Sequence, residues 1–276
     1  MNNDKYEIVI KPGKSIGHYW KELISFKELF IILAWRDITV RYKQTVLGIL
    51  WTIIRPFLTM IVLTVVFSKI AKLPSEGVPY PLLVLVGMVP WQFFSSSLTE
   101  SSNSLISNSS LLTKVYFPRL ILPSSTIIAS LVDFLISLIL VFILMIYYRH
   151  VPSINIIFLP LFLAIIILSS LGAGFFIAAL NVKYRDFRYI VPFFVQFGLY
   201  ITPVGFTSKI VAEKWKLIYY LNPMAGPIDG FRWALLTNES RIYLPGLILS
   251  SFVTILILIL GISYFRNTEK KFADLI

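Results

Sequence analysis

The chain has 276 residues, of which 57% are hydrophobic and only 14% are charged. A soluble globular protein carries roughly 25% charged residues, so this composition excludes a soluble globule and indicates an integral membrane protein. Lys and Arg outnumber Asp and Glu by 25 to 14. In a membrane protein this basic excess belongs to loops near anionic lipid, and we expect no nucleic-acid partner.

The N-terminal segment is predicted to be a polar arm followed by an interface helix. Residues 1–18 are mixed and polar, without the apolar run of a cleavable signal peptide. From residue 19 to about residue 38, polar side chains recur at helical steps and the remaining surface is apolar; they are Lys21, Ser25, Glu28 and Arg36. A span would place several charges in lipid, so we expect an amphipathic helix lying in the membrane interface, within an N-terminal region of residues 1–45.

Six later segments are apolar enough to be predicted as membrane-spanning helices, which take about 20 residues each. In chain order they are residues 46–70, 81–98, 121–148, 154–180, 189–204 and 244–265. We therefore expect an all-α polytopic membrane protein, with one transmembrane domain over residues 46–265 and a tail at 266–276. An even span count places both termini on one side. Basic stretches at 41–44 and 183–188, tight against span ends, predict that this side is cytoplasmic.

Residues 215–236, before the last span, are apolar but interrupted. Asn222-Pro223, Gly226-Pro227 and Gly230 break the segment too often for it to cross in one piece. Irregular backbone at membrane depth must be shielded by protein or line a cavity. We therefore predict a re-entrant hairpin of two half-helices.

The loop at about residues 108–118 is predicted to hold a short docking helix. Asn108 suits a helix start, and Pro118 limits how far the helix can run. A short amphipathic helix on a loop can dock into a groove on a partner, and an ordinary connecting turn is the alternative. The side chains expected to face outward together are Leu111, Leu112, Lys114, Tyr116 and Phe117.

Two ionisable residues lie inside predicted spans. Asp133 is near the middle of the third, and Arg55, followed by Pro56, is in the first. Charges at membrane depth are costly and normally face a bundle interior or an aqueous path. We expect Arg55 to lie on a substrate path because Pro56 also loosens the helix there. For Asp133 a structural pairing is an equally good interpretation.

The sequence offers little for catalysis. His18 and His150 have no metal-ligand spacing, so we expect no metal site. The acidic residues Glu213, Asp229 and Glu239 are scattered and do not form the paired carboxylates of a glycan-cleaving enzyme. These features argue against an enzyme.

Aromatic residues make up 15% of the chain, and interfacial belts account for most of them. A subset lies within the spans, where rings lining a cavity could stack weakly against sugars. Together with Arg55, the predicted channel residues are Trp51, Phe57, Trp91, Phe93, Phe94, Phe197 and Tyr200.

Four blocks of this sequence resemble the ABC-2 type permeases that export cell-surface polysaccharides, above all the O-antigen and teichoic-acid exporters. The blocks are residues 35–57, 89–123, 181–206 and 219–236, and they follow the family's order. The resemblance implies a homodimer in a bacterial cytoplasmic membrane, with two copies of a separate ATPase that binds ATP and Mg. This chain would itself carry no cofactor.

The resemblance also implies roles for particular residues. The substrate would be a glycan linked to undecaprenyl pyrophosphate, and the loop at 108–118 would be the coupling helix for the ATPase. Basic residues that could engage the pyrophosphate are Arg41, Lys43, Lys183 and Arg185. The hairpin would gate the outer mouth of the channel through Asn222, Pro223, Gly226 and Asp229.

Two other functions stay open at this point. An ABC-2 drug or lipid efflux permease would share the coupling loop but leave surface glycan unchanged. A polytopic glycan-modifying enzyme would depend on acidic side chains on outward loops, such as Asp229 or Glu239.

Overall fold

The structure is a computed structural model that describes residues 16–43, 48–75, 77–184, 186–236, 242–270 and 272, with side chains for all of these except residues 16–18, 48 and 49. Within these ranges every regular element is a helix, which confirms the all-α prediction. The first elements are α1 (Ile16–Ser25), α2 (Lys27–Lys43), α3 (Gly48–Thr64), η1 (Val65–Ile70), α4 (Tyr80–Ser107), α5 (Ser109–Lys114) and α6 (Ile121–Tyr147). The remaining elements are η2 (Ile154–Phe158), α7 (Leu159–Lys183), α8 (Phe187–Ile201), η3 (Ser208–Ile210), α9 (Glu213–Tyr219), α10 (Ala225–Leu235) and α11 (Leu244–Glu269).

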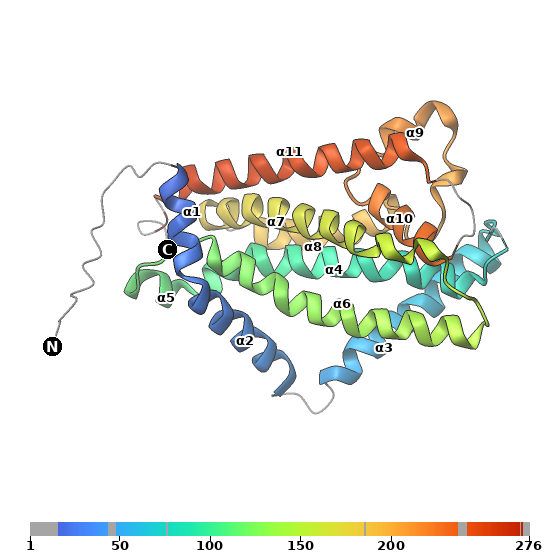
Figure 1. Ribbon diagram of the computed structural model, residues 1–276, viewed down its shortest axis with the longest axis horizontal. Helices are drawn as coiled ribbons and strands as arrows, with labels where there is room; N and C mark the ends of the chain where they lie inside the picture. The colour runs from blue at the N-terminus through green and yellow to red at the C-terminus, as the bar shows by residue number, and fades with distance from the viewer. Residues whose placement is uncertain are drawn as a thin grey trace.

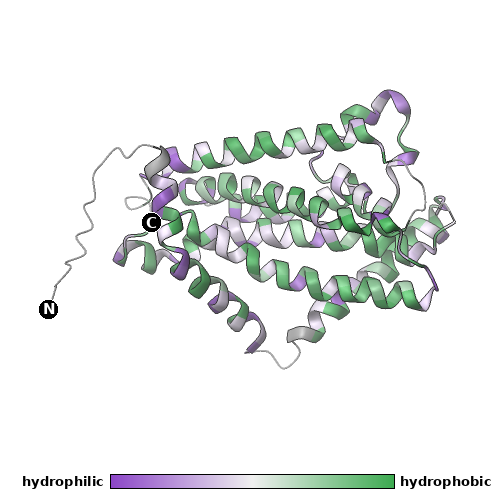
Figure 2. Cartoon of the chain, in the orientation of Figure 1, coloured by the Kyte–Doolittle hydropathy of each residue, from purple (hydrophilic) through white to green (hydrophobic). Residues whose placement is uncertain are grey.

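Four long helices form the body of the molecule. In Figure 1, α4, α6, α7 and α11 run side by side, and α7 packs against both α4 and α11. The start of α1, the helix α5 and the end of α11 lie together at one end of this bundle, which we call the terminal end. The helices α9 and α10 lie toward the opposite end. Figure 2 shows that the long helices are mostly hydrophobic along their length, as a membrane-spanning bundle requires.

Among the described residues, five helical stretches are long and apolar enough to cross a membrane, namely Leu50–Ile70, Tyr80–Ser107, Ile121–Tyr147, Ile154–Lys183 and Leu244–Glu269. The predicted fifth span, residues 189–204, corresponds to the shorter apolar helix α8. The structure therefore agrees with six apolar segments, of which one is short.

The helix α4 continues nine residues beyond the predicted end at residue 98, as far as Ser107. Its last turns carry short polar side chains that bond back to the helix. The hydroxyls of Ser102 and Ser104 donate to the carbonyls of Thr99 and Ser101, each at 2.8 Å. These internal bonds let a polar sequence stay helical inside the protein, where hydropathy alone predicted an end.

Glycines bring α7 and α11 into close contact. A Cβ atom on Gly261 would overlap the carbonyl oxygen of Gly172, so the two backbones meet where neither residue has a side chain. Helices in membranes associate through such small residues because lipid supplies little hydrophobic driving force between them.

The predicted interface helix forms as α1 and α2, which meet at Phe26. The narrow polar stripe is predicted on a surface that is otherwise apolar. In the structure, some of these apolar residues are buried and others are exposed. Leu33 and Ala34 are buried, whereas Ile31 and Trp35 remain more than 60% exposed in the single chain. One flank therefore packs on the bundle and the other is available to lipid, which suits the interface position predicted from sequence.

Candidate functional site

The helices α3 and α8 present an apolar and aromatic surface that the other described residues leave exposed. On α8 the exposed rings include Tyr189, Phe193, Phe197 and Tyr200, spaced by four, four and three residues. Such spacing places them along one side of the helix. The rings of Phe193 and Phe197 are stacked, with centroids 5.7 Å apart and planes at 23°. A continuous aromatic stripe thus runs along α8.

The predicted channel aromatics divide into two groups. Trp51 and Phe57 are exposed on α3, and Phe197 and Tyr200 are exposed on α8. The α4 rings do not share this open surface: Trp91 is 7% exposed and Phe93 is 2% exposed, while Phe94 is half-buried.

The burial of the α4 rings has a packing cause. A Cβ atom on Gly198 of α8 would lie 2.5 Å from the Trp91 indole, so this ring fills the contact between α4 and α8. The ring of Phe93 packs on Phe134 of α6, with centroids 5.5 Å apart. In these positions Trp91 packs under the exposed helix α8, and Phe93 packs between α4 and α6.

The sequence analysis missed three exposed rings on α8, which are Tyr189, Phe193 and Phe194. The four-residue repeat of Tyr189, Phe193 and Phe197 could have identified the first two, whereas Phe194 lies outside this repeat.

A cavity of about 250 Å³ lies between α3, α4 and α6. It combines polar and aromatic side chains, and its lining includes Trp51, Arg55, Gln92, Phe93, Ser96, Ser130 and Ser137. The Oε1 atom of Gln92 and the Oγ atom of Ser130 are buried there without a hydrogen-bond partner in the described chain. Buried polar atoms are normally satisfied, so the cavity offers bonds to water or to the hydroxyl of a ligand.

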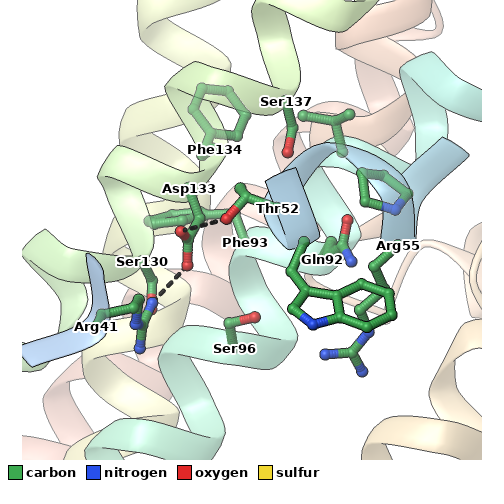
Figure 3. A pocket seen from close by; sticks show the side chains of 13 residues that line it. Arg41, Thr52, Arg55, Gln92, Phe93, Ser96, Ser130, Asp133, Phe134 and Ser137 are labelled. Carbon is green, nitrogen blue, oxygen red and sulfur yellow. Dashed lines mark hydrogen bonds and ion pairs between the residues drawn. The ribbon is translucent and has the colours of Figure 1, made fainter. Parts of the chain in front are cut away.

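Asp133 forms the polar centre of one wall of this cavity. Figure 3 shows Arg41 and Thr52 pointing toward its carboxylate, and Tyr42 also donates to it. The guanidinium of Arg41 makes a second ion pair with Glu100 at 3.0 Å. Burial, and then the hydrogen bond to Asp133, raise the pKa of Tyr42 well above its usual value, so its phenol stays a donor. Of the two interpretations of Asp133, the structure supports pairing.

This cluster also bears on the basic residues predicted to engage pyrophosphate. Arg41 is held by Asp133 and Glu100, so the expectation of a cation available to substrate does not fit its surroundings. Lys43 is exposed at the end of α2, and Lys183 is exposed at the end of α7 with its Nζ 4.8 Å from the Tyr184 ring centre. Arg185 lies outside the described residues.

The predicted coupling loop contains a helix shorter than expected. The helix α5 ends at Lys114, and the chain is extended at Val115. The expectation that all four apolar side chains face outward is wrong for Leu112 and Phe117, which are buried in an apolar cluster at the terminal end. Lys114 and Tyr116 are exposed and Leu111 is partly exposed. The two buried side chains anchor the loop, and the exposed part is a narrower surface than predicted.

The predicted hairpin forms two helices, α9 and α10, separated at Asn222-Pro223. The expectation of further breaks at Gly226-Pro227 and Gly230 is wrong, because these residues lie inside α10. Pro227 falls in the first turn, where no backbone N–H is required.

The glycines of α10 serve close packing instead of breaking the helix. A Cβ atom on Gly226 would lie 2.9 Å from Ser250 of α11, and one on Gly230 would lie 2.5 Å from the ring of Phe162 on α7. Only glycine allows α10 to approach both helices this closely.

A buried arginine that the sequence analysis missed connects α10 to the segment after α8. Arg232 is 5% exposed and donates to the carbonyl oxygens of Val204 and Phe206, each at 2.7 Å. It also reaches the carbonyl of Leu83 on α4 at 3.4 Å. The phenol of Tyr80 donates to the carbonyl of Gly205 at 2.7 Å. The irregular backbone at 202–207 is thereby satisfied inside the protein, as a low-dielectric environment demands.

Two of the predicted gate residues belong to the same polar network. Asp229 accepts a hydrogen bond from the Tyr220 phenol at 2.7 Å and lies 3.8 Å from Arg232. The side-chain amide of Asn222 donates to the hydroxyl of Thr202 at 2.9 Å. These bonds fix the hairpin to the end of α8. They give Asp229 a structural partner, and Glu239 lies outside the described residues.

No group of three or more His, Cys, Asp or Glu side chains that could hold a metal ion occurs within the part of the chain that the structure describes.

Comparison with known proteins places these features in context. The sequence profile of the ABC-2 type transporter family matches residues 28–236. The O-antigen export system permease protein RfbA of Myxococcus xanthus is 28% identical over 92% of this chain and 97% of its own length. The protein of the same name from Klebsiella pneumoniae is 26% identical over 90% of this chain and 95% of its own length. The polysialic acid transport protein KpsM of Escherichia coli is 22% identical over 85% of this chain and 91% of its own length.

Proposed function

The chain belongs to the ABC-2 type transporter family, and on that premise we propose that it is the permease subunit of an exporter that moves a polysaccharide across a bacterial cytoplasmic membrane. The observation that carries this proposal is similarity over 85% or more of the chain to proteins named for O-antigen export and for polysialic acid transport. The exposed aromatic stripe on α8 supports it, because flat rings bind the apolar faces of sugars weakly enough to let a polymer keep moving.

We propose that transport is driven by a separate ATPase, which would bind ATP and Mg. The exposed residues Lys114 and Tyr116 at the terminal end are the surface offered to it, held in place by the buried side chains of Leu112 and Phe117. ATP binding would close the ATPase dimer and push this loop, and the bundle would shift around the polymer. In this arrangement the terminal end, and with it both chain termini, faces the cytoplasm.

We also propose that two copies assemble through α3 and α8, the apolar helices that this chain leaves most open. The chain contains no cysteine, so a single introduced cysteine cannot cross-link within the chain, and a cross-linked product of twice the mass reports a second copy. We expect V62C on α3 and I201C on α8 to give cross-linked dimers in membranes, while I255C, equally exposed on α11, stays monomeric. Cross-linking of I255C alone would place the interface elsewhere.

The proposed substrate is a glycan carried on undecaprenyl pyrophosphate. Of the four basic residues considered for the pyrophosphate, Lys43 and Lys183 are exposed, which supports a role for them in this contact. Arg41 instead orders the wall of the cavity through Asp133.

The experiment that tests export is deletion of the gene in its host, followed by fractionation and surface labelling of the polymer. We expect full-length lipid-linked polymer trapped on the cytoplasmic side, and restored surface polymer when the wild-type gene is returned. Normal surface polymer would overturn the proposal, and altered drug resistance beside it would favour the efflux alternative. Polymer that is missing or chemically altered everywhere would favour a glycan-modifying enzyme.

A further inference from the structure

One carboxylate at the terminal end joins three parts of the chain that are far apart in sequence. Glu269, at the last position of α11, accepts hydrogen bonds from the phenol of Tyr19 on α1 at 3.1 and 3.3 Å. It also accepts one from the backbone N–H of Arg119 at 3.0 Å. Arg119 lies between α5 and α6, directly after the loop offered to the ATPase. The side chain therefore contacts the first helix, the coupling loop and the last helix at once.

Further contacts stabilise the junction formed by Glu269, Tyr19 and Arg119. The guanidinium of Arg119 donates to the backbone carbonyl of Glu269 and lies 5.7 Å from the ring centre of Phe272. The guanidinium of Arg266 lies 4.8 Å from the ring centre of Tyr19. The charges of Arg119 and Arg266 both favour the ionised form of Glu269. Every bond of the carboxylate named above crosses between elements.

The junction rests on an apolar base. Phe265 and Phe272 are fully buried and pack edge to face, with centroids 5.3 Å apart. The same cluster contains Leu112 and Phe117 of the coupling loop and Leu33 of α2. Burial, and then the Glu269 carboxylate, raise the pKa of Tyr19 far above its usual value, so the phenol remains a donor. A charged group bonded on several sides within such a base is held in one geometry.

We propose that Glu269 is the positioning residue of a rigid three-way joint, through which α1, the coupling loop and α11 move as one body when the ATPase pushes the loop. This inference rests on the proposed function. The joint connects the pushed surface to the ends of two helices, and the residues named for it do not line the cavity between α3, α4 and α6. We therefore assign it the transmission of displacement.

The first test uses E269Q in the complete complex with the ATPase, in lipid vesicles. The amide keeps the shape but loses the charge and one acceptor oxygen. We expect the ATPase to remain bound and ATP hydrolysis to continue, while polymer exported per ATP falls about tenfold. Y19F removes a single donor and is expected to lower the same ratio about threefold. The matched control is E28Q, an identical change at an exposed position on α2, which should match the wild type.

The double variant Y19F/E269Q should export no less per ATP than E269Q alone, because both changes remove the same contact. An unchanged export ratio in E269Q would overturn the proposal. If E269Q is not inserted in normal amount, a wild-type ratio in Y19F would overturn it as well, since that variant removes only a hydroxyl.

A second measurement does not depend on the polymer. Spin labels at T113C on α5 and K270C after α11 report the distance across the joint, and the natural chain has no cysteine to interfere. We expect one narrow distance distribution in both the ATP-free and ATP-bound complex, and a broadened one in E269Q. A wild-type distance that changes with ATP would overturn the rigid joint. Failure of the wild-type complex to export polymer would instead contradict the proposed function. The distance measurement would still test the rigid joint.

Discussion

The helices α4 and α3 are both apolar spans of the same chain, yet they lie in opposite environments. In the apolar stretch of α4, 72% of the residues are buried, against 17% in that of α3. The helix α4 is surrounded by α6, α7, α8 and α10, whereas α3 and α8 leave most of their apolar surface open. Hydropathy alone does not distinguish these two kinds of helix. The apolar residues of α4 pack within this chain, whereas those of α3 are exposed to lipid, a second copy or substrate.

The largest expected effect is a loss of stability when the buried residue Arg232 is replaced. In R232M the carbonyls of Val204 and Phe206 lose this donor inside the protein, and that of Leu83 loses a longer contact at 3.4 Å. An unsatisfied buried carbonyl costs about 1–3 kcal/mol, so we expect a loss on the order of 3 kcal/mol or more. The measurement is thermal unfolding of the detergent-purified protein.

The matched control for this change is R188M, which removes an exposed arginine from α8 and should unfold near the wild-type temperature. Equal unfolding temperatures for R232M and R188M would mean that water, and not Arg232, satisfies the segment after α8.

A smaller loss of stability is expected from a substitution at the contact between α10 and α7. In G230A the added methyl group would lie 2.5 Å from the buried ring of Phe162, and overpacking of this kind costs about 1–3 kcal/mol. The second change F162L makes room, so the double variant G230A/F162L should be more stable than the sum of the two single losses. Strict additivity in thermal unfolding would show that the ring moves aside without cost.

Changes to the exposed rings of α8 should lower transport without lowering stability. F193L and F197L remove stacked rings that are more than half exposed, so we expect stability to change by less than about 0.5 kcal/mol. A lost ring contact of about 0.7 kcal/mol with the polymer would lower export roughly threefold.

Surface labelling of polymer checks this expectation, and F252L on α11 is the control because its ring is exposed to a similar degree. A loss of export in F252L as large as in F197L would show that the effect comes from the lipid-facing surface in general. A loss of stability in F193L would mean that α8 depends on its rings for packing.

The same contrast explains what the sequence could and could not predict. The long spans, the all-helical fold and the helix break at Asn222-Pro223 follow from apolar length and proline, which act locally. The burial of Trp91 and the partners of Asp133 depend on which helix lies opposite. Arg232 could not be singled out from the sequence, because its acceptors are backbone carbonyls, which leave no pattern there.

The smallest expected effect lies in one ion pair on α9, where the two partners differ in exposure. Glu213 and Lys216 are 2.8 Å apart, but the Glu213 side chain is 82% exposed and that of Lys216 only 15%. An exposed ion pair contributes about 0–1 kcal/mol, so E213Q should change thermal unfolding by no more than that, and less in high salt.

The Nζ atom of Lys216 also lies 4.5 Å from the ring centre of Tyr243. K216M removes this contact in addition to the pair and should cost about 0.5–1 kcal/mol more than E213Q. High salt should not abolish that difference, because the contact with the ring is partly buried. Equal effects of E213Q and K216M would show that the ion pair alone carries the interaction. The greater burial of Lys216 would then add nothing to the free energy of unfolding.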